Sequence, residues 1–236
     1  MLKKGLILII LIAFSTIFLN LFLSFNGSEE LSKLGSYYAN NEPTEVGAAN
    51  IVTAVVVTYR GLDTLGEVVI LFLTAAIIGF FLKLSKEEKD ENTRKENLRA
   101  SSEILQTASK LLFPIILLFG IYIFINGHLT PGGGFQGGAV IASGVVLLFM
   151  ANPITKINHR VLSFIESVSG LSFVLIGILG IVLAGGFLDN SILKLGDFGK
   201  LFSAGAIPVI YMFVGLKVGS ELSSIVASLN ETQNEK

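Results

Sequence analysis

The sequence contains no cysteine among its 236 residues. This absence excludes disulfides, thiolate zinc sites, cysteine nucleophiles and iron–sulfur clusters bound by this chain. Any redox chemistry must belong to a partner, and we expect no cofactor in the chain itself. Charge is scarce as well, since 15% of the residues are charged and the formal net charge is −1. With no basic stripe and no interleaved aromatics, nucleic-acid binding is also excluded.

Hydrophobic residues, in contrast, make up 52% of the chain. A soluble protein of this composition would have too few charged residues to cover its surface. The apolar residues form blocks of about 20, which is the length that crosses a hydrocarbon layer of roughly 30 Å as a helix. We therefore expect an all-α, multi-pass bundle of about six transmembrane helices in the cell membrane, surrounded by the lipid bilayer.

Six spans are expected, at residues 5–25, 64–84, 104–125, 135–150, 161–187 and 201–219. The first is interpreted as an uncleaved anchor, because it exceeds the ~7 to 15 residues of a signal-peptide core and lacks a small-x-small cleavage site. Residues 26–49 are polar, with Pro43 as a helix breaker, and we expect them outside the bilayer. Residues 51–57 are too short to span and predict an interfacial or re-entrant piece. Pro208 is expected to bend the sixth helix.

Positive charge indicates the topology. The basic residues gather at Lys3 and Lys4, at 86–99 and at 156–160, which lie on one side if all six spans cross. The positive-inside rule then places both termini in the cytoplasm. The run at 86–99 also suggests a boundary. We expect a two-helix segment at 1–85, a charged linker at 86–103, a four-helix domain at 104–228 and a polar tail at 229–236.

A glycine-rich loop, NGHLTPGGGFQGG at 126–138, separates the third and fourth spans. A backbone without side chains can approach an ion or a neighbouring helix closely. A tight helical hairpin that needs glycines explains the pattern equally well. Nucleotide binding is not expected, because Ala139 and Val140 stand where a phosphate-binding loop needs Lys and Ser or Thr.

One of the two histidines, His128, lies in this loop. Its ordinary pKa of ~6.5 suits a proton relay, although a structural, hydrogen-bonded histidine is the plainer interpretation. A metal site shared with His159 is not expected, because the topology puts the two on opposite faces of the membrane.

A carboxylate, Glu67, lies about one turn into the second span. An intramembrane carboxylate is costly and by default indicates an ion or proton path. The structural alternative is a capping box, because Thr64 and Glu67 have the T-x-x-E spacing. Both roles can coexist.

Three more ionisable residues lie in or near spans. Glu166 is about two turns, or ~10 Å, into the fifth helix, so it should face protein or water rather than lipid. Lys217 and Glu221 have i,i+4 spacing near the expected end of the sixth helix. The plainer interpretation has both side chains reach the inner interface and pair weakly there.

The motif GHLTPGGGFQGG at 127–138 closely resembles the signature of the B subunit of Mrp-type multisubunit sodium/proton antiporters, the MnhB family. The resemblance covers about residues 104–228, including HRVLSFIESVSG at 159–170 and GLKVGSE at 215–221. The stretch NIVTAVVVTYRGLDTLGE at 50–67 resembles the E-type subunit of membrane-bound hydrogenases, equivalent to the C-terminal end of the large Mrp A subunit. The chain therefore resembles a fusion of two pieces that are usually encoded apart.

The resemblance implies a place in a sodium-translocating membrane module without an active site of its own. The implied partners are other Mrp- or hydrogenase-type membrane subunits, Na⁺ and H⁺, and redox subunits with iron–sulfur clusters if the parent complex is a respiratory enzyme. The fusion itself favours a redox-linked complex, because standalone antiporters carry the E-like piece on their large subunit. By this resemblance, Glu67 would match the motif glutamate linked to ion translocation. The only metal ion considered for this chain is Na⁺, bound near Glu67.

The candidate residues form two groups. Those considered for the ion path are Asp63, Thr64, Glu67, His128, Thr130 and Glu166. Those considered for the motif or its support are Pro131, Gly132, Gly133, Gly134, Phe135, Gln136, Gly137, Gly138, Lys217 and Glu221. Two hypotheses follow, a subunit that lines a sodium or proton path and a scaffold that joins antiporter-like subunits. An independent enzyme is the weakest class, because no nucleophile, base and orienting group have suitable spacing.

Overall fold

The computed structural model describes residues 2–25, 30–87, 101–155 and 157–234. The chain divides into two compact units, Met1–Tyr37 and Tyr38–Lys236, which are treated separately below. Within the described residues the elements are helical: α1 (Leu2–Ser24), α2 (Lys33–Glu45), α3 (Ile51–Thr53), the π-helix η1 (Ala54–Tyr59), α4 (Gly61–Glu87), α5 (Glu103–Ile125), α6 (Gly134–Ala151), α7 (His159–Leu183), the 3₁₀ turn η2 (Asn190–Ile192) and α8 (Ile207–Asn234).

Six helices are long and apolar enough to cross a membrane, which confirms the predicted helical membrane bundle. They are α1, α4, α5, α6, α7 and α8. In the first unit, α1 is apolar on all sides and none of its best 18-residue window is buried. Such a helix is stable only with lipid or protein around it, so α1 is a membrane span by its composition. Pro43 lies inside α2, which ends two residues later at Glu45.

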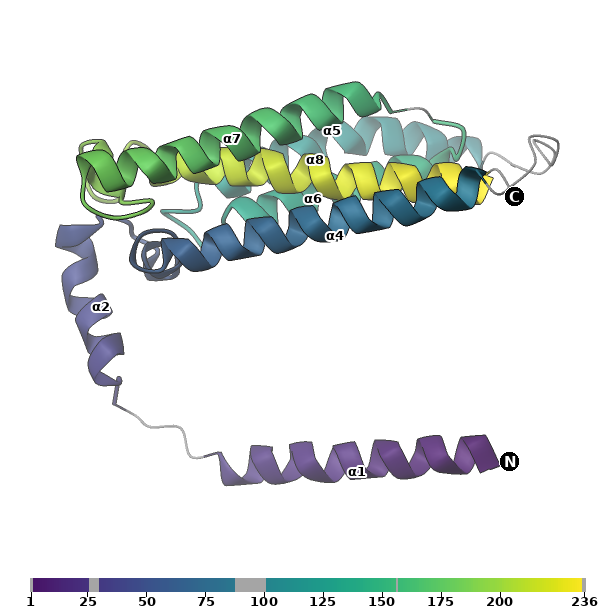
Figure 1. The fold of residues 1–236 in the computed structure, drawn as a ribbon, viewed down its shortest axis with the longest axis horizontal. Helices are drawn as coiled ribbons and strands as arrows, with labels where there is room; N and C mark the ends of the chain where they lie inside the picture. Colours follow the sequence, from purple (N-terminus) through teal and green to yellow (C-terminus); the bar gives the residue numbers. More distant parts are fainter. Residues whose placement is uncertain (1, 26–29, 88–100, 156, 235–236) are drawn as a thin grey trace. The chain divides into compact units, whose positions relative to one another are not determined.

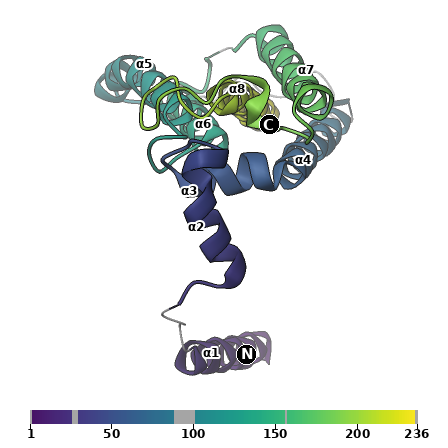
Figure 2. The same cartoon turned by 90° about the vertical axis from the view of Figure 1, so that its left-hand side faces the viewer.

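The second unit is built around α8. This helix packs against α4, α5, α6 and α7, and α6 also packs against α5. Figure 2 views the helices end-on, with α5 and α6 on one side of α8 and with α4 and α7 on the other. More than half of the best α8 window is buried, at 56%, against 6% for α4. Lipid or further protein must therefore cover the outer faces of the surrounding helices.

The sixth span differs from its prediction of 201–219, because α8 begins later and ends later. Pro208 is the second residue of α8 and does not bend it, so that expectation was wrong. In the first turn of a helix the missing proline N–H has no carbonyl partner to lose, so proline starts helices there without disruption. As a consequence Lys217 and Glu221 lie in the middle of α8 and not near its end.

The helices α4 to α8 alternate in direction, as Figure 1 shows. At one end of the bundle the 126–133 loop meets the 184–206 loop, where His128 faces Lys200. At the other end Asn230 Nδ2 donates to Pro153 O at 3.0 Å. His159 pairs with Glu231 at the same end, so the two histidines lie at opposite ends of α8. Which end faces the cytoplasm stays a prediction, and most of the expected 86–103 linker lies outside the described residues.

Glycines let α6 approach its neighbours at backbone distance. A Cβ atom at Gly138 would lie 2.7 Å from Val218 Cβ, 2.8 Å from Gly219 N and 2.9 Å from Gly215 O, all on α8. A Cβ at Gly134 would lie 2.6 Å from Val214 Cγ1. Such small-residue contacts are how membrane helices pack without a hydrophobic driving force between them. The glycine-rich signature therefore continues into a packing surface on α6.

We expect Gly138→Ala to destabilise the bundle by about 1–3 kcal/mol, because the added methyl group meets α8 backbone that cannot move aside. The thermal unfolding midpoint of the purified complex measures the effect. Gly79→Ala on α4 is the matched control, since a Cβ there meets nothing within 4 Å. Equal midpoints for the two variants would contradict the packing role of Gly138.

Candidate functional site

The segment Asn50–Tyr59 holds the glycine-rich loop in place. Asn50 Nδ2 donates to Gly127 O at 2.8 Å and to Thr130 O at 3.0 Å, and Asn50 N donates to His128 O at 3.0 Å. Thr53 Oγ1 donates to Gly127 O at 2.6 Å and accepts from the Tyr211 hydroxyl at 3.1 Å. The motif that resembles the E-type subunit and the motif that resembles the B-type one are therefore joined by direct hydrogen bonds.

Residues 51–57 do not span, in agreement with the prediction, and they are exposed only at their start, at Ile51 and Val52. Thr53, Ala54 and Val57 are fully buried. The π-helix η1 ends at Tyr59, and the N–H of the next residue, Arg60, donates to Val55 O at 2.8 Å. A π-helical turn inside helical structure often marks a functional site.

The predicted capping box is wrong, because α4 begins at Gly61 and not at Thr64. Thr64 is buried, and its hydroxyl donates to Val56 O at 2.7 Å. The chain bends at Arg60 between η1 and α4, and the threonine hydroxyl supplies a donor to a carbonyl of the π-helix. Thr64 therefore joins η1 to α4, and Glu67 is left without a capping role.

Glu67 itself points away from the packed face of α4 and is exposed. Among the residues that the structure describes, it makes no hydrogen bond or ion pair. It does act electrostatically on the Tyr211 hydroxyl. Asp63, the other acidic candidate on α4, forms an exposed ion pair with Arg60.

His128 is fully buried in the loop, and its Nε2 lies 3.4 Å from Lys200 O. Burial lowers the pKa of His128 below its ordinary 6.5, and backbone groups of Lys200, Leu201 and Ile125 raise it in part. The neutral form is therefore favoured at neutral pH. Thr130 Oγ1 donates to Asn126 O at 3.2 Å, which is a bond within the loop.

The remaining signature residues divide between packing and exposure. Phe135 packs against the main core cluster, Gly133 and Gly137 are buried, and Pro131 and Gln136 are exposed. Gly132 has a φ of 152°, which a residue with a side chain rarely adopts. Since Asn50 and Thr53 already occupy the loop carbonyls of Gly127 and Thr130, the geometry favours the tight hairpin over an open ion-binding backbone.

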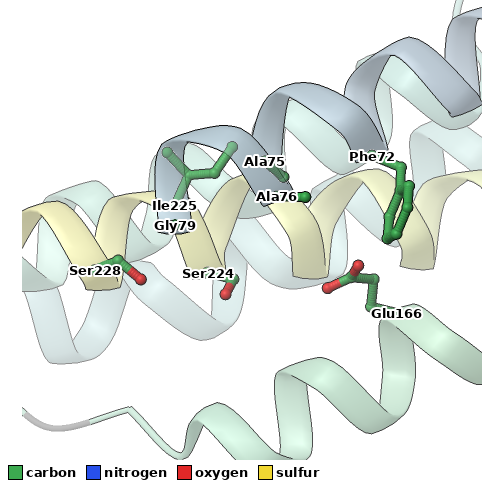
Figure 3. A pocket seen from close by; sticks show the side chains of 8 residues that line it. All are labelled: Phe72, Ala75, Ala76, Gly79, Glu166, Ser224, Ile225 and Ser228. Atoms are coloured by element: carbon green, nitrogen blue, oxygen red, sulfur yellow. The ribbon is translucent and has the colours of Figure 1, made fainter. Parts of the chain in front are cut away.

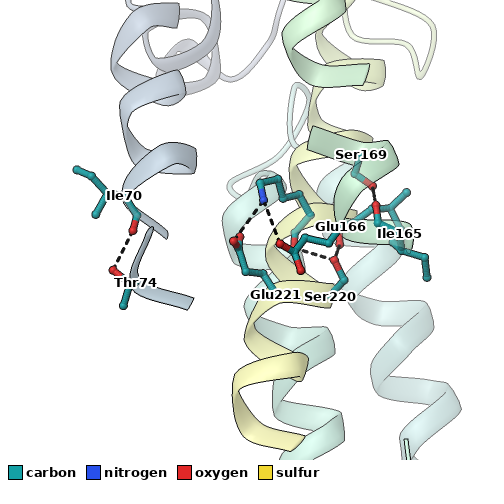
Figure 4. A network of polar contacts seen from close by, with 9 residues as sticks. Ile70, Thr74, Ile165, Glu166, Ser169, Ser220 and Glu221 are labelled. Carbon is teal, nitrogen blue, oxygen red and sulfur yellow. Dashed lines mark hydrogen bonds and ion pairs between the residues drawn. The ribbon is translucent and has the colours of Figure 1, made fainter. Parts of the chain in front are cut away.

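A buried ion cluster lies between α7 and α8. Lys217 Nζ is 3.2 Å from Glu221 Oε1 and 3.8 Å from Glu166 Oε1, and its ammonium lies 5.1 Å from the Phe72 ring centroid. The side-chain exposures are 8% for Lys217, 0% for Glu221 and 20% for Glu166. Figure 4 shows Glu166 and Glu221 pointing into the same space from the two helices. The expectation that Lys217 and Glu221 reach the membrane interface was therefore wrong.

Next to the cluster is a cleft of about 120 Å³. Figure 3 shows the carboxylate of Glu166 directed into it. The other lining residues come from α4 and α8, and they are Phe72, Ala75, Ala76, Gly79, Ser224, Ile225 and Ser228. The sequence pattern singles out Glu166 but does not indicate that α4 comes to the same place.

Several positioning residues could not be recognised from the sequence pattern. Buried Glu42 accepts from Ala48 N at 2.6 Å, and burial raises the pKa of Glu42. Asn190 Nδ2 donates to Val46 O at 2.9 Å and to Ala204 O at 3.1 Å. Asn50 was visible as the first residue of its motif. Nothing in the pattern marks Glu42 or Asn190, because Glu42 binds a backbone N–H, and Asn190 binds two backbone carbonyls and the hydroxyl of Thr58, which is distant in sequence.

Comparisons with known proteins agree with this architecture. The family model described as a domain related to the MnhB subunit of Na⁺/H⁺ antiporters matches residues 104–224, and the model for the E subunit of MBH, MbhE, matches residues 4–94. The chain is therefore a multi-pass cell-membrane component of the Mrp-type antiporter class. It belongs to the MnhB family, with an MbhE segment in front of the MnhB domain.

Three similar proteins show how far the similarity extends. A chain in the structure of the membrane-bound sulfane sulfur reductase, an archaeal respiratory membrane complex, is 39% identical with a TM-score of 0.80, and the match covers 97% of this chain and 98% of that one. An uncharacterized protein of Methanocaldococcus jannaschii is 32% identical, over 74% of each chain. The B subunit of the Na⁺/H⁺ antiporter of Bacillus subtilis is 58% identical, over 20% of this chain and 34% of that protein.

We expect the 126–133 loop to open more readily as the pH falls below about 6.5, because unfolding lets His128 take up a proton at its ordinary pKa. The stability is fully present above that pKa and is lost towards the lower folded value, by up to about 1.4 kcal/mol per pH unit. Hydrogen exchange of peptides from this loop, corrected for the intrinsic rate, measures the opening.

In this experiment His128→Gln should remove the pH response, because glutamine stays neutral. His159→Gln is the matched control, since His159 pairs with Glu231 at the other end of α8. A pH response that survives in His128→Gln would assign it to another group.

Proposed function

We propose that this chain and its partners in an Mrp-type module together build a sodium and proton path in which Glu67 binds the ion or passes the proton. One observation carries the proposal. Glu67 lies about 9 Å along α4 from Gly61, exposed and without an ion pair among the described side chains. A carboxylate facing lipid is costly, so a neighbouring protein or a water-filled path must cover it.

The position of Glu67 relative to the signature loop supports the same proposal. Glu67 acts electrostatically on Tyr211, which donates to Thr53, and Thr53 in turn donates to Gly127 O. Glu67 therefore lies near a hydroxyl that helps hold the loop. Carboxylate oxygens are also ligands that suit a hard cation such as Na⁺.

The parent complex in this proposal is redox-linked. Its support is the match over nearly the whole length of both chains to a component of an archaeal respiratory complex. In such a complex this chain supplies no catalytic centre and binds no cofactor. Because it lacks cysteine, iron–sulfur clusters would be held by partner subunits.

A scaffold that only joins antiporter-like subunits is the alternative. The glycine contacts between α6 and α8 and the hydrogen-bonded loop favour it, since both serve packing. These contacts leave the exposed carboxylate of Glu67 without an explanation, and for this reason we favour the path.

We expect Glu67→Gln to lower the apparent sodium affinity of the assembled complex at least about tenfold. A unit charge about 4 Å from the ion contributes about 4 kcal/mol at an effective dielectric constant of about 20, and about 1.4 kcal/mol corresponds to tenfold in affinity. Sodium uptake by vesicles that contain the complex measures the change.

Glu103→Gln is the control for this variant, because Glu103 is an exposed glutamate in the first turn of α5. Glu67→Asp should restore part of the affinity, since it keeps the charge. An assembled Glu67→Gln complex with unchanged sodium transport would leave the scaffold as the better function.

We also expect that an affinity-tagged copy of this chain, purified in mild detergent, will co-purify with antiporter-type membrane subunits and with soluble iron–sulfur subunits. Mass spectrometry of the purified complex identifies them. Recovery of membrane subunits alone would point to a plain antiporter as the parent complex.

A further inference from the structure

The cluster of Glu166, Lys217 and Glu221 lies deep in the bundle. Lys217 is about 15 Å and Glu221 about 21 Å along α8 from Ile207, while Glu166 is about 10 Å along α7 from His159. The three groups therefore lie within the membrane-spanning parts of both helices. They are separate from Glu67, which lies near the start of α4.

The cluster has an unbalanced charge. Two carboxylates and one ammonium sum to −1, and such a charge is costly in the membrane interior. Of the described side chains on the packed elements, α6 has no titratable group. The other titratable groups lie outside the cluster, and they are Glu103, Lys110 and Tyr122 on α5, Asp63 and Glu67 on α4, His159 and Arg160 on α7, and Tyr211 and Glu231 on α8. The charged groups that act on Glu221 are Lys217 and Glu166.

One oxygen of the cluster has no partner. Glu221 is fully buried, and its Oε2 makes no hydrogen bond in the described structure. Burying an ionised carboxylate with an unsatisfied oxygen is unfavourable, and the neutral acid removes the charge. A cation such as Na⁺ fits the cluster less well, because the Lys217 ammonium already lies between the carboxylates, at 3.2 Å and 3.8 Å from them.

The lining of the cleft extends from Glu166 towards the end of the bundle where α8 terminates. Glu166 lines the cleft at about one-fifth exposure, and Ser224 and Ser228 continue the lining towards the end of α8. A volume of about 120 Å³ with three polar lining residues can hold several waters. Glu221, Ser224 and Ser228 follow the i, i+3, i+7 spacing of one helix face, so polar groups run from the cluster to the cleft.

We propose that Glu166, Lys217 and Glu221 form a proton-binding site that exchanges one proton, through this cleft, with the end of the bundle where α8 terminates. A proton from the aqueous phase, relayed by waters in the cleft that are left unchanged, binds one carboxylate to give a carboxylic acid, and the charge of the cluster changes from −1 to neutral. The Lys217 ammonium then pairs with the remaining carboxylate. Release reverses these steps, and no electron is transferred.

This site is distinct from Glu67 and rests on the proposed function only in that both need an assembled, transporting complex.

The direct test is infrared difference spectroscopy of the purified complex during a pH step. Wild type should gain a carbonyl band of a protonated carboxylic acid as the pH falls, and the band should shift in deuterated water. Glu221→Gln or Glu166→Gln should remove it, whereas Glu67→Gln and Glu231→Gln should keep it.

Proton transport provides the second measurement. Glu221→Gln should reduce it on the order of a hundredfold, the usual loss when a positioned proton-transfer group is removed. Glu231→Gln is the matched control on the same helix, because Glu231 is half-exposed and pairs with His159. Glu166→Gln covers the case in which Glu221→Gln fails to assemble, since Glu166 is partly exposed at the cleft.

Three results would overturn the proposal. The first is an acid band that persists in both Glu166→Gln and Glu221→Gln. The second is wild-type proton transport in the Lys217→Met, Glu221→Met double variant, which would show that the cluster is a structural ion pair. The third is a band abolished by sodium at constant pH, which would assign a cation site. Loss of the band in Glu221→Gln with normal sodium transport in Glu67→Gln would support this site and refute the path at Glu67.

Discussion

The backbone contact between α6 and α8 at Gly138 is the constraint on which the other features depend. Because no side chain separates the helices there, α8 is held in the middle of the bundle with α4, α5 and α7 around it. A central α8 directs Lys217 and Glu221 towards α7 and α4 and away from lipid. It also brings Tyr211 to Thr53, and so ties the Asn50–Tyr59 segment to the glycine-rich loop. One close helix contact thus positions both polar regions.

Small residues also make room for charge. A Cβ atom at Gly170 on α7 would lie 3.3 Å from the Lys217 Cδ atom, so the glycine leaves space for the lysine stem. The Lys217 ammonium then lies 3.8 Å from Glu166 Oε1 on α7 and 5.1 Å from the centroid of the Phe72 ring on α4. Helix packing and the buried charges are therefore one arrangement, in which a glycine that favours close packing also allows an ionisable side chain to stay inside.

Much of the fold could be predicted from the sequence, because the length and composition of a membrane span are set by the bilayer. Five of the six spans start within three residues of their expected positions, and α8 differs because Pro208 starts the helix instead of bending it. The site was predictable only in part. Glu67 and Glu166 stood out as intramembrane carboxylates, whereas the burial of Lys217 depends on α7 and α4 covering α8. Periodicity within one helix does not contain that information.

The two polar regions lie at different depths with apolar side chains between them. Along α4, Glu67 and Gly79 are about 18 Å apart. Between them, Val68 is part of the main core cluster and Leu71 packs against that cluster. On α8, buried Val214 separates Tyr211 from Lys217. A continuous water-filled path would dissipate the ion gradients that an antiporter module couples. The apolar layer prevents such a leak within this chain, so any coupling between the two regions must pass through the packed helices or through partner subunits.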